Sequence, residues 1–507
     1  MSRRAATFDG LVKAPMLPRS VLSRQGSGAR SAGLVIAALL GALLFGLVAV
    51  MGNPVFVALA AGLVLGPLLL FSPLGTVWAF MAGSLLLAGV VQLFAGSVGS
   101  RMAWALSGLG FLLFALALVR AVVDPRTRRH TPAFIWLLLV FVGYTVVNAA
   151  LQGSSVYEFA SGFKRYHQAV GLTLALTWLG FSGLQFAQWR RLFVLAVVVQ
   201  TPLALYQLWH FVPIREALRW ANPGLVPVDV VAGTFGSGLL GGGANSGMAA
   251  FLVVMLGFAI AYRREGLISR GRFVLLLAFL LTPLALGETK IVVVLLPVVF
   301  LTLFWRRLLT RPLFGLIGLS LGILMTLSAA TIYVQMSNKS LDDRIADTIA
   351  YNFGDRGYGR AVLNRTTVLT FWANEQSLAD PVGAVMGHGL GTAHDVTGGS
   401  VARRFSGYGI GLTTASLLLW EQGVFGLMLF LVAWALAVRA AIRLLRSATD
   451  PDERATLTGI VAALWIIGIY FVYHDLPVES LPYQTFSASI LGYLAWLHRQ
   501  RALASAR

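Results

Sequence analysis

Apolar stretches separated by short polar segments follow one another from residue 31 to residue 497. Most of them approach the roughly 20 residues that a membrane-spanning helix requires. We place the predicted spans at 31–50, 54–71, 75–96, 102–119, 131–150, 166–184, 192–212, 246–262, 273–287, 291–305, 312–334, 412–438, 455–473 and 481–497. The pattern predicts an all-α polytopic membrane protein with about 14 transmembrane helices.

The composition of the 507 residues agrees with this pattern, since 57% are hydrophobic and only 12% are charged. About a quarter of the residues in soluble domains are charged, so a water-soluble globular protein is excluded. The absence of cysteine excludes disulfides, thiolate metal sites and a cysteine nucleophile. The formal charge of +19 does not indicate a nucleic-acid partner, because the basic residues lie between the spans.

The distribution of basic residues orients the predicted helices. Residues 1–30 contain six Lys and Arg and no apolar core, so we expect a disordered cytoplasmic tail and not a cleavable signal peptide. With this tail inside, two thirds of the 39 Lys and Arg residues lie on the inner side of the membrane. Both termini are then cytoplasmic.

The long polar segments fall on the outer side, where we expect the functional residues, because long loops in compact proteins are usually functional. The longest of them, 335–411, is expected to form an external cap of amphipathic helices. The expected order is the tail 1–30, helices 1–11 in 31–334, the cap 335–411, helices 12–14 in 412–498, and a second cytoplasmic tail at 499–507.

Two groups of charges lie at the outer ends of predicted spans. Lys164, Arg165 and His167 either anchor the chain at the interface or clamp a phosphate in the outer leaflet. Glu288 and Lys290 lie in a turn between two apolar arms of 15 residues, which reach only about 22 Å. We therefore expect this turn to lie below the outer surface, in a water-filled cavity, and not in a tilted hairpin.

Two further charges occur in apolar surroundings. Arg365 is expected in the middle of an apolar helical stripe, where an anionic substrate or an acidic residue of the cap would be its partner. Glu421 lies either about 14 Å inside a helix that begins near Leu412 or at the interface, and the sequence leaves both positions open.

Other residues of the predicted outer segments give weaker indications of function. Seven glycines occur within 233–247, so that this loop either cradles a phosphate with its N–H groups or forms a re-entrant turn, with Asn245 at its end. His474 and Asp475 follow a predicted span, and a histidine beside an aspartate can act as a general base. His388 and His394 lack a recognisable metal-ligand spacing, so we expect no metal site.

The sequence has many cations in its predicted outer segments and no ATP-binding motif. This combination is typical of an enzyme that binds a lipid-linked pyrophosphate as its activated donor. Arg and Lys would neutralise the phosphates and stabilise the departing pyrophosphate, while a side-chain base would deprotonate an acceptor hydroxyl. The activated lipid donor already stores the energy, so no nucleotide or other cofactor is expected.

The order of the motifs resembles that of the O-antigen ligase and polymerase superfamily. The resemblance covers about residues 160–430, and its motifs are Gly233-Thr-Phe with Asn245, Thr289-Lys290, Asn364-Arg365 with Trp372, Asp380-Pro381, Gly387-x-Gly-x-Gly391 and Glu421-x-Gly-x-x-Gly426. Two departures stand out. Val231-Ala232 replaces the arginine of that family, and Gly411-Leu-Thr-Thr414 replaces the catalytic histidine of the ligases.

The resemblance, with the missing histidine, implies a polymerase of the bacterial inner membrane with its active site facing the periplasm. It would be a metal-independent glycosyltransferase that moves a growing glycan from undecaprenyl pyrophosphate to the next lipid-linked repeat unit. By analogy Arg165, Lys290 and Arg365 hold the pyrophosphate. The expected supporting cations are Lys164, Arg360, Arg403 and Arg404, and the expected bases are His474 and Glu421, followed by His167.

The expected partners are the lipid bilayer, the undecaprenyl-pyrophosphate-linked oligosaccharide, a flippase that delivers it and a co-polymerase that regulates chain length. Two alternatives remain open. One is a ligase that joins glycan to lipid A core or to protein. The other is a lipid-linked oligosaccharide flippase, although such a transporter would not need the long 335–411 segment with its arginine-bearing helix.

Overall fold

The computed structural model describes residues 72–95, 97–222, 225–236, 238–310, 363–376, 380–395 and 398–505, together with single positions between 311 and 362. The predicted tail 1–30, the predicted spans 31–50 and 54–71, nearly all of 312–334 and Arg360 lie outside these residues. The chain divides into two units, Met1–Ser72 and Pro73–Arg507, and the described helices belong to the second.

The elements of the described residues are helices. The first half of the unit contains α3 (Pro73–Ala82), which continues through a π-helical turn (Gly83–Leu87) into α4 (Ala88–Ala95), then α5 (Ser97–Val123), α6 (Ala133–Leu151), α7 (Val156–His167), α8 (Val170–Trp178) and α9 (Gly183–Leu218). The second half contains α10 (Ala244–Arg264), α11 (Arg270–Leu286), α12 (Val292–Thr310), α15 (Thr367–Gln376), α16 (Pro381–Met386), α17 (Ser400–Arg404), α18 (Thr414–Ser447), α19 (Pro451–Tyr473), α20 (Leu476–Glu479) and α21 (Leu481–Ser505).

Seven helices of the described residues are long and apolar enough to cross a membrane, which makes the chain an α-helical membrane protein. They are Pro73–Phe94, Arg101–Val123, Ala133–Leu151, Gly183–Leu218, Ala244–Arg264, Thr414–Ser447 and Pro451–Tyr473. The predicted spans 273–287, 291–305 and 481–497 are helical, as α11, α12 and α21, but are not among these seven. The total of 14 spans and their orientation remain predictions.

The predicted span 166–184 is not one helix. Its central part is the nine-residue helix α8, and every residue of α8 is buried. This helix packs between α5 and α21, so protein surrounds its apolar side chains instead of lipid. Apolar runs that a neighbouring protein layer covers have the same composition as lipid-facing runs, which explains the difference.

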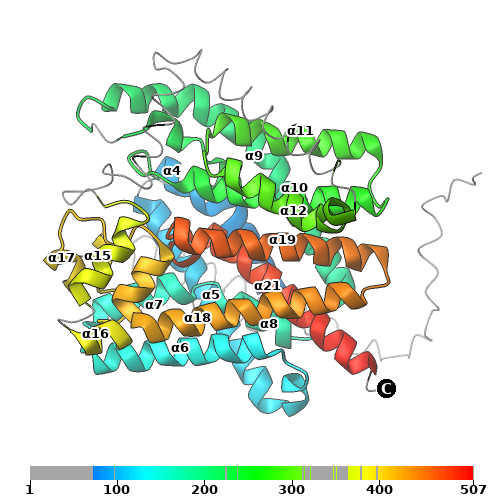
Figure 1. The fold of residues 1–507 in the computed structure, drawn as a ribbon, viewed down its shortest axis with the longest axis horizontal. Helices are drawn as coiled ribbons and strands as arrows, with labels where there is room; N and C mark the ends of the chain where they lie inside the picture. The colour runs from blue at the N-terminus through cyan, green and yellow to red at the C-terminus, as the bar shows by residue number, and fades with distance from the viewer. Residues whose placement is uncertain are drawn as a thin grey trace, which may run out of the picture. The chain divides into compact units, whose positions relative to one another are not determined.

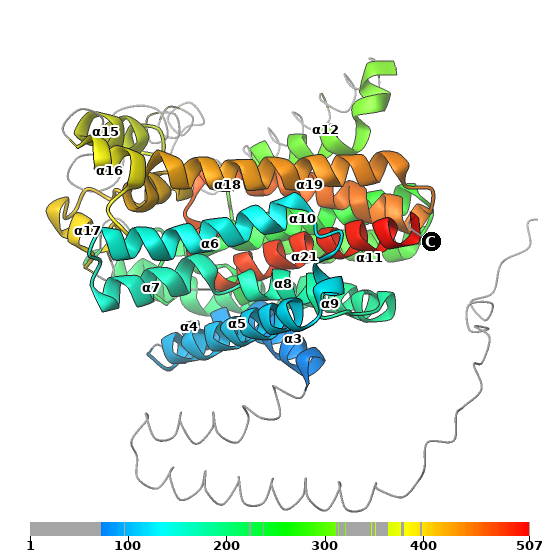
Figure 2. The ribbon, with the colours of Figure 1, turned by 90° about the horizontal axis from the view of Figure 1, so that it is seen from below.

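The long helices lie side by side, and the short helices α15, α16 and α17 gather at one end of them (Figure 1). We call this end the α15 end. At this end α19 finishes and α18 begins, and these two helices pack against each other along their length. Figure 2 shows α3, α4 and α5 on the side of the bundle opposite to α18.

Ion pairs connect the helices at the opposite end of α19. Arg190 of α9 pairs with Asp452 at 2.8 Å, and Arg454 pairs with Glu265 of α10 at 2.7 Å. These side chains are partly exposed, so each pair contributes at most about 1 kcal/mol. Arg365 and His474, which the sequence analysis singled out, lie at the α15 end instead.

Candidate active site

The last residue of α19, Tyr473, and the six residues that follow it, as far as Glu479, contain or contact several residues of the predicted site. We call them the 473–479 segment. The backbone carbonyl of His474 accepts hydrogen bonds from Thr414 N at 3.1 Å and from Thr414 Oγ1 at 2.9 Å. These bonds fasten the segment to the first turn of α18, so that its side chains have a defined position.

The His474 imidazole lies between a carboxylate and the start of α10. Its Nδ1 is 2.5 Å from Asp475 Oδ1. Its Nε2 points to Gly243, where a Cβ atom would lie only 2.6 Å away. Gly243 directly precedes α10 and has a φ of 79°. One ring nitrogen is therefore held by a carboxylate, while the other faces the N-terminus of a long helix.

Arg365 reaches the same segment, although it is not within a helix as expected. The side chain of Asn364 accepts hydrogen bonds from Thr366 N and Thr367 N, so α15 begins only at Thr367. Asparagine is a preferred N-cap, which explains this start. Arg365 Nε donates to the carbonyl of Tyr473 at 2.7 Å, and its guanidinium lies 4.2 Å above the Tyr473 ring.

The other end of the segment binds Arg165. Glu479 Oε2 lies 3.5 Å from Arg165 Nε, and Glu479 Oε1 lies 3.1 Å from His394 Nε2. Arg165 Nη1 is buried and has no hydrogen-bond partner among the described residues. Lys164 lies 5.2 Å from the centre of the Trp104 ring, and burial lowers the pKa of its amine, an effect that Arg165 increases.

Glu421 is enclosed and not interfacial, with 1% of its surface exposed. Its Oε1 accepts a hydrogen bond from Ala393 N at 3.1 Å, while its Oε2 is buried without a hydrogen-bond partner among the described residues. The carboxylate thus holds the loop that carries His394. This arrangement favours a positioning role over proton transfer to a substrate.

The two glycine motifs of the second half contact each other directly. Helix α18 is broken at Gly423, whose φ of 64° is the left-handed conformation that glycine adopts most readily. The break releases backbone carbonyls of α18, and those of Trp420 and Glu421 accept hydrogen bonds from His388 N at 2.9 Å and Gly389 N at 3.0 Å. The motif order noted in the sequence thus corresponds to a contact in the structure.

A second polar cluster surrounds Asp229, a residue that the sequence analysis did not single out. Asn245 Nδ2 donates to Asp229 Oδ1 at 3.1 Å and to the carbonyl of Gly287 at 3.2 Å. Burial raises the pKa of Asp229, against the opposing effects of Arg215, Asn245, His474 and Lys290. This cluster joins the loop before α10 to the turn between α11 and α12.

The first part of the glycine-rich loop, residues 231–236, is buried, and its first N–H groups are already bonded. Gln207 Oε1 accepts from Ala232 N at 2.9 Å and from Gly233 N at 2.7 Å, and Gln200 Oε1 accepts from Thr234 N at 2.8 Å. These three N–H groups are therefore not available to cradle a phosphate, and the two interpretations of the rest of the loop stay predictions.

The turn with Glu288 and Lys290 joins two helices whose apolar parts are short, as expected. Helix α11 begins with Arg270-Gly-Arg272, and the apolar part of α12 is Val292–Trp305. Both side chains of the turn are exposed. The depth of the turn in the membrane stays a prediction.

The remaining predicted residues lie apart from the 473–479 segment. His167 is fully buried, with Nε2 2.9 Å from Thr145 Oγ1 and its ring against Phe163. Arg403 and Arg404 are exposed on α17, where Arg404 lies over the Phe405 ring.

Comparisons with protein-family models and with curated proteins find no match to this chain. The resemblance of its motifs to the O-antigen ligase and polymerase superfamily therefore supports a proposal and does not assign a family.

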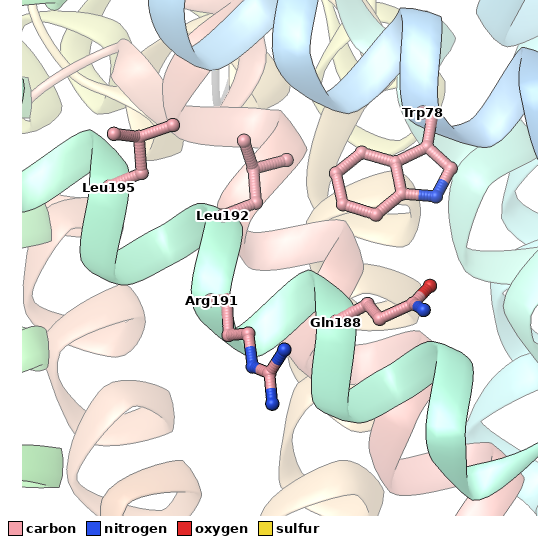
Figure 3. A pocket seen from close by; sticks show the side chains of 5 residues that line it. All are labelled: Trp78, Gln188, Arg191, Leu192 and Leu195. Atoms are coloured by element: carbon pink, nitrogen blue, oxygen red, sulfur yellow. The ribbon is translucent and has the colours of Figure 1, made fainter.

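A cavity of about 560 Å³ lies between α3 and α9. It is lined by Trp78 of α3 and by Gln188, Arg191, Leu192 and Leu195 of α9 (Figure 3). No residue of the predicted site lines this cavity, so it does not enter the proposed chemistry.

The sequence analysis did not single out three residues: Glu479 in the 473–479 segment, and Asp229 and Arg215 in the polar cluster around Asp229. Arg215 carried a usable signal, because it lies three residues beyond the predicted outer end of the apolar span 192–212. Glu479 and Asp229 are acids in outer segments, and only their tertiary contacts distinguish them from other surface acids.

Proposed function

We propose that this protein is a bacterial inner-membrane polysaccharide polymerase with its active site at the α15 end, facing the periplasm. It would transfer a growing glycan from undecaprenyl pyrophosphate to the next lipid-linked repeat unit. The observation that carries the proposal is the 473–479 segment, which contacts Arg365 at its start, contains His474, and pairs with Arg165 at its end.

The proposed donor site contains Arg165 and Arg365, supported by Lys164. Arginine binds phosphate oxygens through several N–H groups at once, and the buried Nη1 of Arg165 has no other partner among the described residues. The departing pyrophosphate gains negative charge as its bond to the sugar breaks, so fixed cations beside it stabilise the transition state.

The proposed general base is His474. Nδ1 lies beside Asp475 Oδ1 and also accepts a hydrogen bond from Asp475 N at 2.9 Å. The proposal requires the tautomer with the proton on Nδ1, directed at Asp475 Oδ1, so that Nε2 can accept the proton of an acceptor hydroxyl. The deprotonated oxygen then forms the new glycosidic bond to the anomeric carbon of the donor sugar. The bond from that carbon to the pyrophosphate breaks, and undecaprenyl pyrophosphate leaves with the electron pair. The proton on His474 returns to solvent, so the cycle balances without a cofactor.

Glu421 and His394 act on this site through other residues. Glu421 holds the loop of His394, His394 contacts Glu479, and Glu479 contacts Arg165. This chain of contacts runs from the break in α18 to the proposed pyrophosphate site. In this proposal both are positioning residues.

The test uses purified protein in nanodiscs with its lipid-linked repeat unit as the only substrate. A ladder of repeat multiples on a gel, lost in Arg365→Ala, supports the polymerase. Transfer that appears only after lipid A core is added indicates a ligase instead. Lipid translocation in liposomes without any transfer indicates a flippase and contradicts the proposal.

A further inference from the structure

Arg215 is a buried cation whose hydrogen-bonding capacity is only partly used. It lies in the last turn of α9, and 1% of its surface is exposed. Its Nη1 donates to the carbonyl of Gly241 at 2.6 Å, while its buried Nε has no hydrogen-bond partner among the described residues. A buried arginine with an unused N–H group normally has an anionic partner.

Arg215 points to the start of α10. Gly241, which it contacts, lies three residues before the first residue of this 21-residue helix. The N-cap residue Gly243 has no side chain to satisfy the first N–H groups of the helix, although Ser246 N donates to Asn245 Oδ1 at 2.9 Å. The N-terminus of a helix carries a partial positive charge, so this position favours an anion.

Among the described residues, no acid forms an ion pair with Arg215. Asp229 interacts with it electrostatically, but the two described side chains do not form an ion pair. Instead Asp229 accepts a hydrogen bond from Asn245 in the first turn of α10. Arg215, His474 and Lys290 all act electrostatically on Asp229, which is bonded to the first turn of α10.

His474 connects this anion-favouring position to the chemistry. Its Nε2 faces Gly243, so a saccharide that offers a hydroxyl to Nε2 places its neighbouring groups at the N-terminus of α10. Arg165 lies at the far end of the 473–479 segment, beside Glu479. The position at Arg165 therefore serves the donor, and the position at Arg215 serves the acceptor sugar.

We propose that Arg215, Lys290 and the first turn of α10 bind an anionic group, a carboxylate or a phosphate substituent, on the acceptor sugar. This inference rests on the proposed function and specifies its substrate class, which is an acidic repeat unit. The charged substituent would orient the sugar so that its nucleophilic hydroxyl reaches His474 Nε2.

Direct binding to the full-length protein in nanodiscs tests the proposal without requiring turnover. The probes are a disaccharide of glucuronic acid and glucose, its neutral analogue with two glucoses, a glucose disaccharide that carries a phosphate, and inorganic pyrophosphate. We expect at least one acidic disaccharide to bind at least about tenfold more tightly than the neutral one, and Arg215→Gln to abolish this preference. Comparison of the two acidic probes identifies the anion.

Matched variants make the test decisive. Arg191→Gln removes an exposed arginine from the same helix and should leave all binding unchanged. If Arg215→Gln fails to fold, Lys290→Gln, an exposed position, should weaken binding of the acidic disaccharide. Arg165→Gln should weaken binding of pyrophosphate alone.

Three results overturn the inference: no saccharide binds, the acidic and neutral disaccharides bind equally, or Arg215→Gln weakens pyrophosphate binding alone. The third would assign the position to the lipid carrier. Failure of the proposed function looks different. In that case the acidic disaccharide still binds through Arg215, but no lipid-linked repeat unit is extended.

Discussion

Arg165 and Glu479 form an ion pair across the α15 end, with Nε 3.5 Å from Oε2. The same carboxylate contacts His394, and Arg165 keeps a buried Nη1 without a partner among the described residues. The pair thus orients the guanidinium without using all of its N–H groups. An orienting partner of this kind preorganises a cation for a substrate phosphate.

Replacement of Arg165 should abolish most of the activity. We expect Arg165→Gln to reduce the rate of glycan extension by about a hundredfold or more, because one charged group that stabilises the leaving group is lost. Extension is measured from the intensity of the ladder over time. Arg191→Gln, on the exposed face of α9, is the matched control. Equal rates in both variants would exclude Arg165 from the site.

The His474 pair makes a separate prediction. We expect His474→Ala to reduce turnover by about a hundredfold to ten-thousandfold while lipid-linked substrate still binds, because only proton transfer is removed. Asp475→Asn should cause a smaller loss, since it disturbs the orientation of the ring. His498→Ala, far along α21, is the control. Unchanged turnover in His474→Ala would return the base to Glu421.

The break in α18 should be sensitive to a single methyl group. In Gly423→Ala the Cβ atom would lie 2.3 Å from the carbonyl oxygen of Val385, on a backbone with positive φ. We expect a loss of about 2 kcal/mol or more in the free energy of unfolding, measured as a lower unfolding temperature in detergent. Gly143→Ala, a helix position with no atom near the added Cβ, should match wild type. A stable Gly423→Ala variant would contradict the described break.

His388 gives the protein a predictable pH dependence. Burial lowers the pKa of its imidazole, and Arg404 adds to this effect, while Asp380 opposes it. The unfolded chain therefore binds a proton more readily than the folded protein, so stability is lost as pH falls below the ordinary histidine range. We expect the unfolding temperature to fall between about pH 7 and about pH 5, and to fall less in His388→Gln.

The control for this prediction is His498→Gln, which replaces a partly exposed histidine far from His388 in the sequence. It should show the same pH dependence as wild type. If His388→Gln loses as much stability as wild type on acidification, the proton that destabilises the fold binds elsewhere.

The sequence predicts the apolar helices well, because apolar runs of about 20 residues have few other stable forms. It fails at α8, where a buried helix and a lipid-facing helix have the same composition. It also fails at Arg365, although the capping preference of Asn364 indicated a later helix start. Only tertiary contacts show that α8 is buried in protein, whereas the start of α15 can be predicted from the sequence around Asn364.

The candidate site is predictable only in its parts. The sequence singled out Arg165, Arg365 and His474 because charges near apolar spans are unusual. It could not show that the 473–479 segment brings them together, since the partners of Arg165 and Arg365 are more than a hundred residues away in the chain. It also missed the cluster of Asp229 and Arg215, although Arg215 lies only three residues beyond a predicted span.

The most direct test of the central claim is the stoichiometry of product release. Purified protein is incubated with lipid-linked repeat units, and mass spectrometry quantifies undecaprenyl pyrophosphate together with joined repeats. The account predicts one undecaprenyl pyrophosphate for every glycosidic bond formed, with both products absent in Arg165→Gln. Lipid-linked repeats that remain intact, or that only change sides of the membrane, would contradict it.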